Sequence, residues 1–493
     1  MGPLRALRAP GPGSKSRSAA KASDSKLVGG LPLEPLSETF ESLRNIVHEP
    51  VDQGLLPGVA ALVVANGRLR FMEEAGFADV EGSVPMTSTS LVRLYSMTKC
   101  VVVAALMQLV DERLLGLEDL LADHLPAFRG VRVIVEKDDG WPLEGRTQPA
   151  KRPITIRHLL THTSGISGGA APGIDALRRW NKRERAWIDV YKPLTHRVDC
   201  DLVPDLASWI QELAELPLWN HPGEHYSYGY GYDVLGHLIE LKRGKALADC
   251  LREFIFEPLD MCSTAFDLHR IARTPSEGNA SSRRCTGKTP AVPAAARRRL
   301  AVLYRRTKSS RYGADGKHSQ LARVDPERPG AASRWEKPCR IPSAGGCVSS
   351  FAGGLLSTLD DYAKFLLAVL SGGAHPTSGQ RILSSEMATE MLADQTAKLQ
   401  GAPASASPYG NRALGLSCLG EFQRAGAPST GGWFDGVEGV RLWGGAANTA
   451  FKFDPNGGRP VLVLIMSQVV PQDSGETATA LLHAAREALK KEL

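Results

Sequence analysis

The sequence predicts an α+β fold in which one antiparallel sheet is assembled from both ends of the chain around an inserted, mainly helical subdomain. Strand-like apolar runs flank Asn66-Gly67 near the start of the chain, and others flank Asn456-Gly457 near its end. Asn-Gly between apolar runs is a strong signal for a β-hairpin. A long stretch of helical patterns and loops separates the two hairpins, so we expect both to join a single sheet flanked by helices.

Local signals place the main helices. A mostly apolar pattern that contains the run "VVVAALM" predicts a buried helix from about Ser96 to Leu115. In "PITIRHLLTHTSGI", Thr155 can cap a short helix that stops at Gly165. "FAGGLLSTLDDYAKF" reads as a Gly-rich turn followed by a helix, and an amphipathic helix from about Thr477 closes the chain.

A chain of 493 residues with 43% hydrophobic content can bury a large core. We expect a disordered basic tail over residues 1–30 and a single domain over 31–493. A segment rich in Arg, Ala, Pro and Ser and low in aromatic residues predicts a disordered insertion. The expected parts of the domain are the sheet (about 31–95 and 345–493), the helical part (about 96–344) and the basic insertion (about 272–300).

The formal charge of +6 is unevenly distributed. Residues 1–30 carry +5 and residues 270–324 carry +12, which leaves −11 on the rest of the chain. The body of the protein is therefore acidic, and no basic face with base-reading residues is visible, so we expect no nucleic-acid partner. The apolar runs fall short of the ~20 residues that a bilayer-spanning helix needs, and we expect no membrane span.

The eight cysteines are scattered, without a CxxC pair or a Cys/His cluster at zinc spacing. This pattern is typical of a reducing compartment, and it predicts neither a metal nor another cofactor. The N-terminal segment is basic, contains serine and lacks the apolar core of a secretory signal. It is similar to an organelle transit peptide and fits plain disorder equally well, so a cytoplasmic and an organellar location both stay open.

The stretch "LYSMTKCVVVAALMQL" places Ser96 and Lys99 three residues apart at the head of the apolar helix. Residues at this spacing share a helix face, so the serine oxygen and the lysine amine can meet. A lysine amine acts as a base when burial and a helix dipole lower its pKa towards neutrality. The same spacing recurs at Ser18 and Lys21 in the tail, so spacing alone leaves a capping serine and a snorkelling lysine as an equal alternative.

A rival nucleophile is Ser167, at the centre of the G-x-S-x-G pattern in "GISGG". That motif works as a sharp turn between a buried strand and a helix. Here the preceding residues have a helical pattern, which disfavours this interpretation.

Two more stretches offer groups for acyl chemistry. "HPGEHYSYGYGYDVLG" contains alternating tyrosines that could pass a proton, or that could equally be core residues or a carbohydrate-facing surface. In "LWGGAANTAF", Gly444 and Gly445 on a predicted strand would let backbone N–H groups approach a substrate closely; a bulge in an edge strand is the alternative.

Taken together, these stretches in this order resemble the serine β-lactamase and penicillin-binding-protein superfamily, and more narrowly its family VIII carboxylesterases. The resemblance covers about residues 36 to 490, apart from the basic insertion. It implies a β-lactamase/transpeptidase-like fold, with Ser96 as the acylated nucleophile and Lys99 as its general base. It also implies that the catalytic tyrosine is Tyr228, six residues after Pro222. The chain departs from the family pattern at the two positions after it, so Tyr226 stays as an alternative.

The resemblance also bears on the substrate. Trp443 stands where β-lactamases carry Lys or His, and an indole cannot pair with a carboxylate as an ammonium does. By analogy, the oxyanion would be bound by the backbone N–H groups of Ser96 and Ala446. We therefore expect a serine hydrolase for short-chain neutral esters, with no cofactor or metal and with an ester as its small-molecule partner.

Two alternative classes of function remain. The first keeps the acyl-enzyme and changes the substrate or acceptor, as in a β-lactamase, a D-amino-acid peptidase or an acyltransferase. The second is a non-catalytic scaffold that keeps the fold for assembly. The oligomeric state stays open.

Overall fold

An eight-stranded antiparallel sheet lies at the centre of the computed structural model. Its strands follow the order β12-β13-β14-β15-β16-β3-β4-β5. Their bounds are β3 (Gly58–Ala65), β4 (Arg68–Asp79), β5 (Val84–Pro85), β12 (Arg412–Ala413), β13 (Phe422–Gln423), β14 (Arg441–Gly445), β15 (Thr449–Asp454) and β16 (Val461–Ser467). The structure describes residues 27–35, 40–135, 147–166, 191, 193–198, 202–271, 292, 294–306, 321–327, 333–336, 339, 341–344, 354–395, 412–413, 422–423, 439–456, 458–470 and 475–491.

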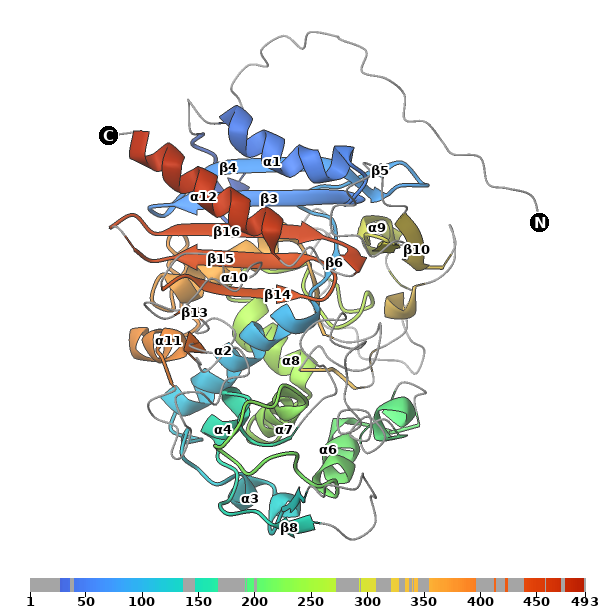
Figure 1. Ribbon diagram of the computed structural model, residues 1–493, viewed down its shortest axis with the longest axis vertical. Helices are drawn as coiled ribbons and strands as arrows, with labels where there is room; N and C mark the ends of the chain where they lie inside the picture. Colours follow the sequence, from blue (N-terminus) through green and yellow to red (C-terminus); the bar gives the residue numbers. More distant parts are fainter. Residues whose placement is uncertain are drawn as a thin grey trace, which may run out of the picture.

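The two ends of the chain meet where β16 pairs with β3 along its whole length, from Ser467↔Val59 to Val461↔Ala65. Figure 1 shows this junction as red strands beside blue ones. The predicted sheet built from both chain ends, with a mainly helical part inserted, is therefore confirmed.

Both faces of the central strands are buried. Every residue of β3, "GVAALVVA", is buried, which explains why this strand is apolar throughout instead of alternating. Val59 and its alternate neighbours pack against α1 (Phe40–Asp52) and α12 (Glu476–Lys491). Ala60, Leu62 and Val64 face a larger core on the other side of the sheet, which includes α2 (Thr98–Asp111).

The helices below the sheet form the second part of the molecule (Figure 1). Their bounds, with those of the remaining small elements, are β1 (Leu27–Val28), β2 (Leu31–Pro32), β6 (Val92–Arg93), α3 (Leu121–His124), β7 (Arg132–Ile134), β8 (Thr147–Pro149), α4 (Ile156–Leu160), α6 (Leu206–Ala214), α7 (Gly231–Arg243), α8 (Leu247–Leu251), α9 (Ala294–Arg299), β9 (Leu303–Arg306), β10 (Leu321–Asp325), β11 (Leu356–Ser357), α10 (Leu359–Leu370), α11 (Ser385–Leu392) and β17 (Val469–Val470). In the described residues, no helix is both long and apolar enough to cross a bilayer.

The first hairpin turn and the N-terminal cap at Thr155 are confirmed, whereas α4 ends at Leu160, before the predicted stop at Gly165. Asn66 and Gly67 have φ angles of 53° and 71°, the left-handed pair that a tight hairpin between β3 and β4 requires. Thr155 caps α4 by accepting a hydrogen bond from the backbone N–H of His158. The hairpin of β15 and β16 is also present, but its connection is longer than the two residues that Asn-Gly predicts, and Gly457 lies outside the described residues.

Parts of the two segments that were expected to be disordered form regular structure. Within the predicted tail, β1 and β2 form a hairpin because Val28 and Leu31 are buried. Within the predicted insertion, Ala294–Arg299 forms α9, and Ala296 packs in a small apolar cluster with Trp335. The rest of these two segments, residues 1–26, 272–291 and 293, lies outside the described residues.

Helix α10 carries a buried carboxylate, Asp361, which is 4% exposed. It accepts hydrogen bonds from the backbone N–H of Ser263 (2.7 Å) and the hydroxyl of Thr264 (3.0 Å). Burial raises the pKa of Asp361 to about 6, and the nearby Lys364 ammonium opposes this shift. The folded state therefore binds this proton more tightly than the unfolded chain does.

We predict that Asp361→Asn flattens the dependence of stability on pH. With a folded-state pKa near 6, Asp361 makes the free energy of unfolding fall as pH rises from about 4 to about 6, by up to about 3 kcal/mol. The amide does not titrate, so this slope should shrink in the variant. Urea unfolding of both proteins at several pH values measures it, and equal slopes would contradict the prediction.

Candidate functional site

Ser96 lies in a 3₁₀ turn, Tyr95–Met97, directly before α2. The preceding residue, Tyr95, has a φ of 46°, in the left-handed region. A residue with a Cβ adopts this conformation at a cost of roughly 1–2 kcal/mol, and it persists only where neighbouring groups hold it. The turn must therefore be braced from outside.

The segment around α10 braces one side of this turn. The backbone N–H of Leu94 donates to the carbonyl of Leu355 at 2.9 Å, and the N–H of Leu355 donates to the Thr98 hydroxyl at 2.8 Å. The buried phenol of Tyr362 donates to the carbonyl of Met97 at 2.9 Å. The "FAGGLLSTLDDYAKF" stretch thus holds the backbone on both sides of Ser96.

Strand β14 braces the other side. The indole N–H of Trp443 donates to the carbonyl of Ser96 at 3.1 Å. A Cβ on Gly445 would lie only 2.2 Å from the carbonyl oxygen of Leu94, so this close approach requires glycine. Gly444 is half-buried, and Ala446 is exposed at the end of the strand.

Ser96, Lys99 and Tyr228 meet at this turn. The Tyr228 hydroxyl lies 2.7 Å from Ser96 Oγ and 2.6 Å from Lys99 Nζ, whereas Lys99 Nζ lies 3.4 Å from Ser96 Oγ. Lys99 is fully buried, while Ser96 and Tyr228 are partly exposed to solvent. Each of the two steps through the phenol oxygen is therefore shorter than the direct distance from Ser96 Oγ to Lys99 Nζ, which favours proton transfer by way of Tyr228.

The neighbouring tyrosines lie elsewhere. The ring of Tyr226 contacts His162, and that of Tyr230 packs edge-on against Trp209. The phenol of Tyr232 donates to the carbonyl of Leu160 at 2.9 Å. Of the four candidates in "YSYGYGY", the one that bridges Ser96 and Lys99 is Tyr228.

The rival nucleophile, Ser167, lies outside the described residues. The residues before it form α4 and a turn that ends at Ile166. A nucleophile elbow needs a buried strand in that position, so this part of the chain does not provide its framework.

Sequence reasoning did not single out three residues that support the site. Leu355 and Tyr362 reach the nucleophile turn only through long-range hydrogen bonds, which no local pattern reveals. His162 lies beside Tyr228. It occupies the position after the C-cap of α4, where glycine or asparagine is usual, and this is the one local signal that could have drawn attention to it.

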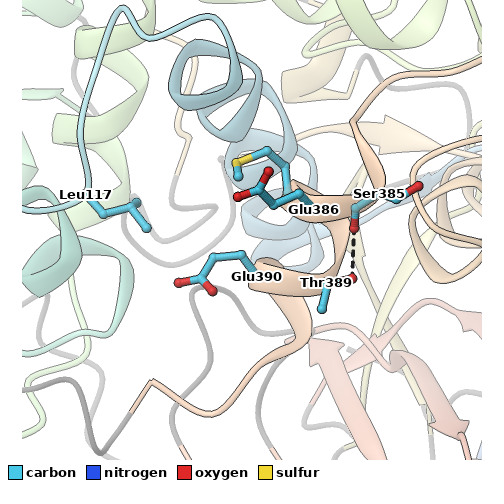
Figure 2. A pocket seen from close by; sticks show the side chains of 6 residues that line it. Leu117, Ser385, Glu386, Thr389 and Glu390 are labelled. Carbon is cyan, nitrogen blue, oxygen red and sulfur yellow. Dashed lines mark hydrogen bonds between the residues drawn. The ribbon is translucent and has the colours of Figure 1, made fainter.

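A surface pocket at α11 is separate from this site (Figure 2). The residue before α11, Ser384, donates to Asp111 in the last turn of α2, whereas Ser96 precedes the first turn. A helix of that length spans about 20 Å. The pocket is lined by Leu117, Ser385, Glu386, Met387, Thr389 and Glu390. Over the described ranges, no three His, Cys, Asp or Glu side chains gather as a metal site.

Comparison with known proteins identifies the family. A sequence profile described as Beta-lactamase matches residues 43–486. Protein Rv1367c of Mycobacterium tuberculosis is 30% identical over 441 residues, which cover 88% of this chain and 91% of that protein. Esterase EstB of Burkholderia gladioli is 31% identical over 241 residues, which cover 48% of this chain and 55% of the esterase.

Solved structures share the fold. The unliganded simvastatin synthase LovD of Aspergillus terreus matches with a TM-score of 0.61 and 20% identity, covering 92% of this chain and 100% of that one. EstCE1, described as a hydrolase with promiscuous acyltransferase activity, matches with a TM-score of 0.58 and 19% identity, covering 90% and 97%. The family profile spans most of the sequence, and the mycobacterial relative aligns over nearly its whole length. The chain therefore belongs to the Beta-lactamase family, as the motifs around Ser96 and Lys99 predicted.

Proposed function

We propose that this protein is a serine hydrolase that cleaves short-chain carboxylic esters through a covalent acyl-enzyme on Ser96. The observation that carries the proposal is the contact of the three polar groups: one phenol oxygen lies within hydrogen-bond distance of both the Ser96 hydroxyl and the Lys99 amine. A nucleophile hydrogen-bonded to a base that a third group orients is the arrangement that covalent catalysis requires.

In the proposed first step, Ser96 Oγ attacks the ester carbonyl and its proton passes to the Tyr228–Lys99 pair. The tetrahedral intermediate would be stabilised by the backbone N–H groups of Ser96 and Ala446, and removing one such donor typically costs about 100-fold in rate or more. The intermediate collapses by breaking the bond to the alcohol, which leaves with a proton from the same pair. Water, deprotonated by the same route, then attacks the acyl-enzyme and releases the acid.

Trp443 supports a neutral substrate. Its indole has a single hydrogen-bond donor, and that N–H already binds the carbonyl of Ser96. The side chain therefore offers neither a charge nor a spare donor to a substrate carboxylate. The name of the relative EstB, an esterase, agrees with this substrate class.

Acyl transfer is the second candidate function. It uses the same acyl-enzyme and replaces water by an alcohol in the last step. The structural relatives favour testing it, because one is described as a synthase and another as a hydrolase with promiscuous acyltransferase activity. Product analysis with an added alcohol separates the two: a new ester indicates transfer, and free acid alone indicates hydrolysis.

We predict that Ser96→Ala lowers p-nitrophenyl butyrate hydrolysis on the order of 10³-fold or more, because no other group in the site can form the acyl-enzyme. Ser167→Ala is the matched control and should keep full activity. Equal activity of Ser96→Ala and the wild type would refute the proposed nucleophile. Failure of a fluorophosphonate to label Ser96 in the folded protein would favour a non-catalytic scaffold.

We also predict that turnover of nitrocefin is far slower than turnover of p-nitrophenyl butyrate. Nitrocefin carries a carboxylate, and Trp443 supplies no ammonium to bind it. The ratio of kcat/KM for the two substrates, measured with one enzyme preparation, tests this. Comparable values would favour a β-lactamase and would reject our interpretation of Trp443.

Trp443→Phe should lower kcat by about five- to ten-fold while KM changes little. Phenylalanine keeps an apolar ring but loses the donor that holds the Ser96 carbonyl, and a net hydrogen bond is worth about 1 kcal/mol. Steady-state kinetics with p-nitrophenyl butyrate measure the split. A change confined to KM would mean that the indole contacts the substrate instead of holding the turn.

A further inference from the structure

The turn after α4 contains a buried imidazole that the proposed reaction does not use. His162 is 4% exposed and has a φ of 56°. Its Nε2 atom is buried without a hydrogen-bond partner among the described residues. Both features carry a cost: the left-handed backbone favours Gly or Asn, and an unpaired buried polar atom is worth about 1–3 kcal/mol of lost stability. Stability alone therefore does not explain a histidine here.

The backbone of the same turn holds the segment that carries Tyr228. The N–H of Ser227 donates to the carbonyl of His162 at 2.6 Å, and the N–H of Gly223 donates to the carbonyl of Thr163 at 2.8 Å. These bonds fix the main chain on the N-terminal side of the phenol. They do not fix the orientation of its ring.

The Tyr228 ring packs beside the Trp443 ring, with 6.1 Å between centroids, and beside the nearer ring of His162. The centroid of the His162 ring lies 4.6 Å from the Tyr228 ring and 4.7 Å from the Tyr232 ring, on which the imidazole stacks with an angle of 24°. The Lys99 amine also lies near both phenols, 4.5 Å from the centroid of Tyr228 and 5.7 Å from that of Tyr232. The two tyrosine rings thus contact both the imidazole of His162 and the amine of Lys99.

The imidazole is uncharged in this environment. Burial lowers the pKa of His162 well below its ordinary value, and the positive charge of Lys99 lowers it further. A neutral ring can pack on the phenols without electrostatic repulsion from Lys99, whereas a cationic ring so close to Lys99 would be disfavoured.

We propose that His162 is a positioning residue for the ester hydrolysis proposed above: its ring packs against the phenol of Tyr228 and keeps the phenol oxygen between Ser96 and Lys99. This inference rests on the proposed function, because ester turnover is its readout. The inference itself concerns the packing of His162 on Tyr228 and not the identity of the substrate. A group displaced by about 1 Å can lose 10²-fold in rate, so the contribution is measurable.

Two substitutions at this position test the proposal. His162→Asn suits the left-handed backbone but removes the ring, so we expect kcat for p-nitrophenyl butyrate to fall at least about ten-fold with KM nearly unchanged. His162→Phe keeps a ring and removes the unpaired nitrogen, so kcat should return to within about three-fold of the wild type. The thermal unfolding temperature of each variant is measured first, so that the rates are compared at a temperature at which every variant is folded.

His158→Asn is the matched control. It removes another buried imidazole of the same helix and turn, whose Nδ1 accepts from the backbone N–H of Thr155. This variant should lose stability and keep kcat. Full kcat in His162→Asn, or equal damage in His162→Asn and His162→Phe, would overturn the positioning role.

The rate of fluorophosphonate labelling at Ser96 distinguishes this inference from the proposed function. Labelling requires an activated serine but no ester substrate. If labelling falls in His162→Asn and recovers in His162→Phe while wild-type ester turnover is absent, the positioning role stands and the ester assignment fails. If labelling is the same in all three proteins, the positioning role fails.

Discussion

The burial of one amino group, that of Lys99, is the constraint on which the arrangement around Ser96 depends. A fully buried lysine is costly unless its surroundings replace the lost water. Here the Tyr228 oxygen accepts a hydrogen bond from it, and two phenol rings present their faces to it. The groups that make this burial tolerable are therefore also the groups that connect Lys99 to Ser96.

The backbone next to Ser96 is likewise held by contacts from other parts of the fold. The left-handed residue Tyr95 stands at the junction of sheet and helices, where α10 and β14 contact the turn from two directions. Neither contact comes from α2, the helix that contains Lys99. The left-handed backbone of Tyr95 is maintained by α10 and β14. Both elements are themselves fixed by packing and strand pairing, and a rigid scaffold of this kind keeps the Ser96 side chain oriented.

Much of the fold could be predicted from the sequence because its signals are local. Asn66-Gly67 forms a hairpin and Thr155 caps a helix by chemistry contained within a few residues. The α9 segment was misjudged because an Arg- and Ala-rich composition resembles disorder, whereas its order comes from packing with Trp335, far along the chain. For the site, the resemblance identified the candidate residues, but not the bond from Trp443 to Ser96 or the support from Tyr362, which exist only after folding.

The pairing of β16 with β3 also governs when the surroundings of Ser96 can be completed during synthesis. Roughly 400 residues separate the two partners, and contacts of such long sequence separation form late. Ser96, Lys99 and Tyr228 leave the ribosome long before Trp443 and β16 do. Until then, β3 presents an open sheet edge and the turn at Ser96 lacks its hydrogen bond from Trp443, so a nascent or truncated chain holds Ser96, Lys99 and Tyr228 without their full framework.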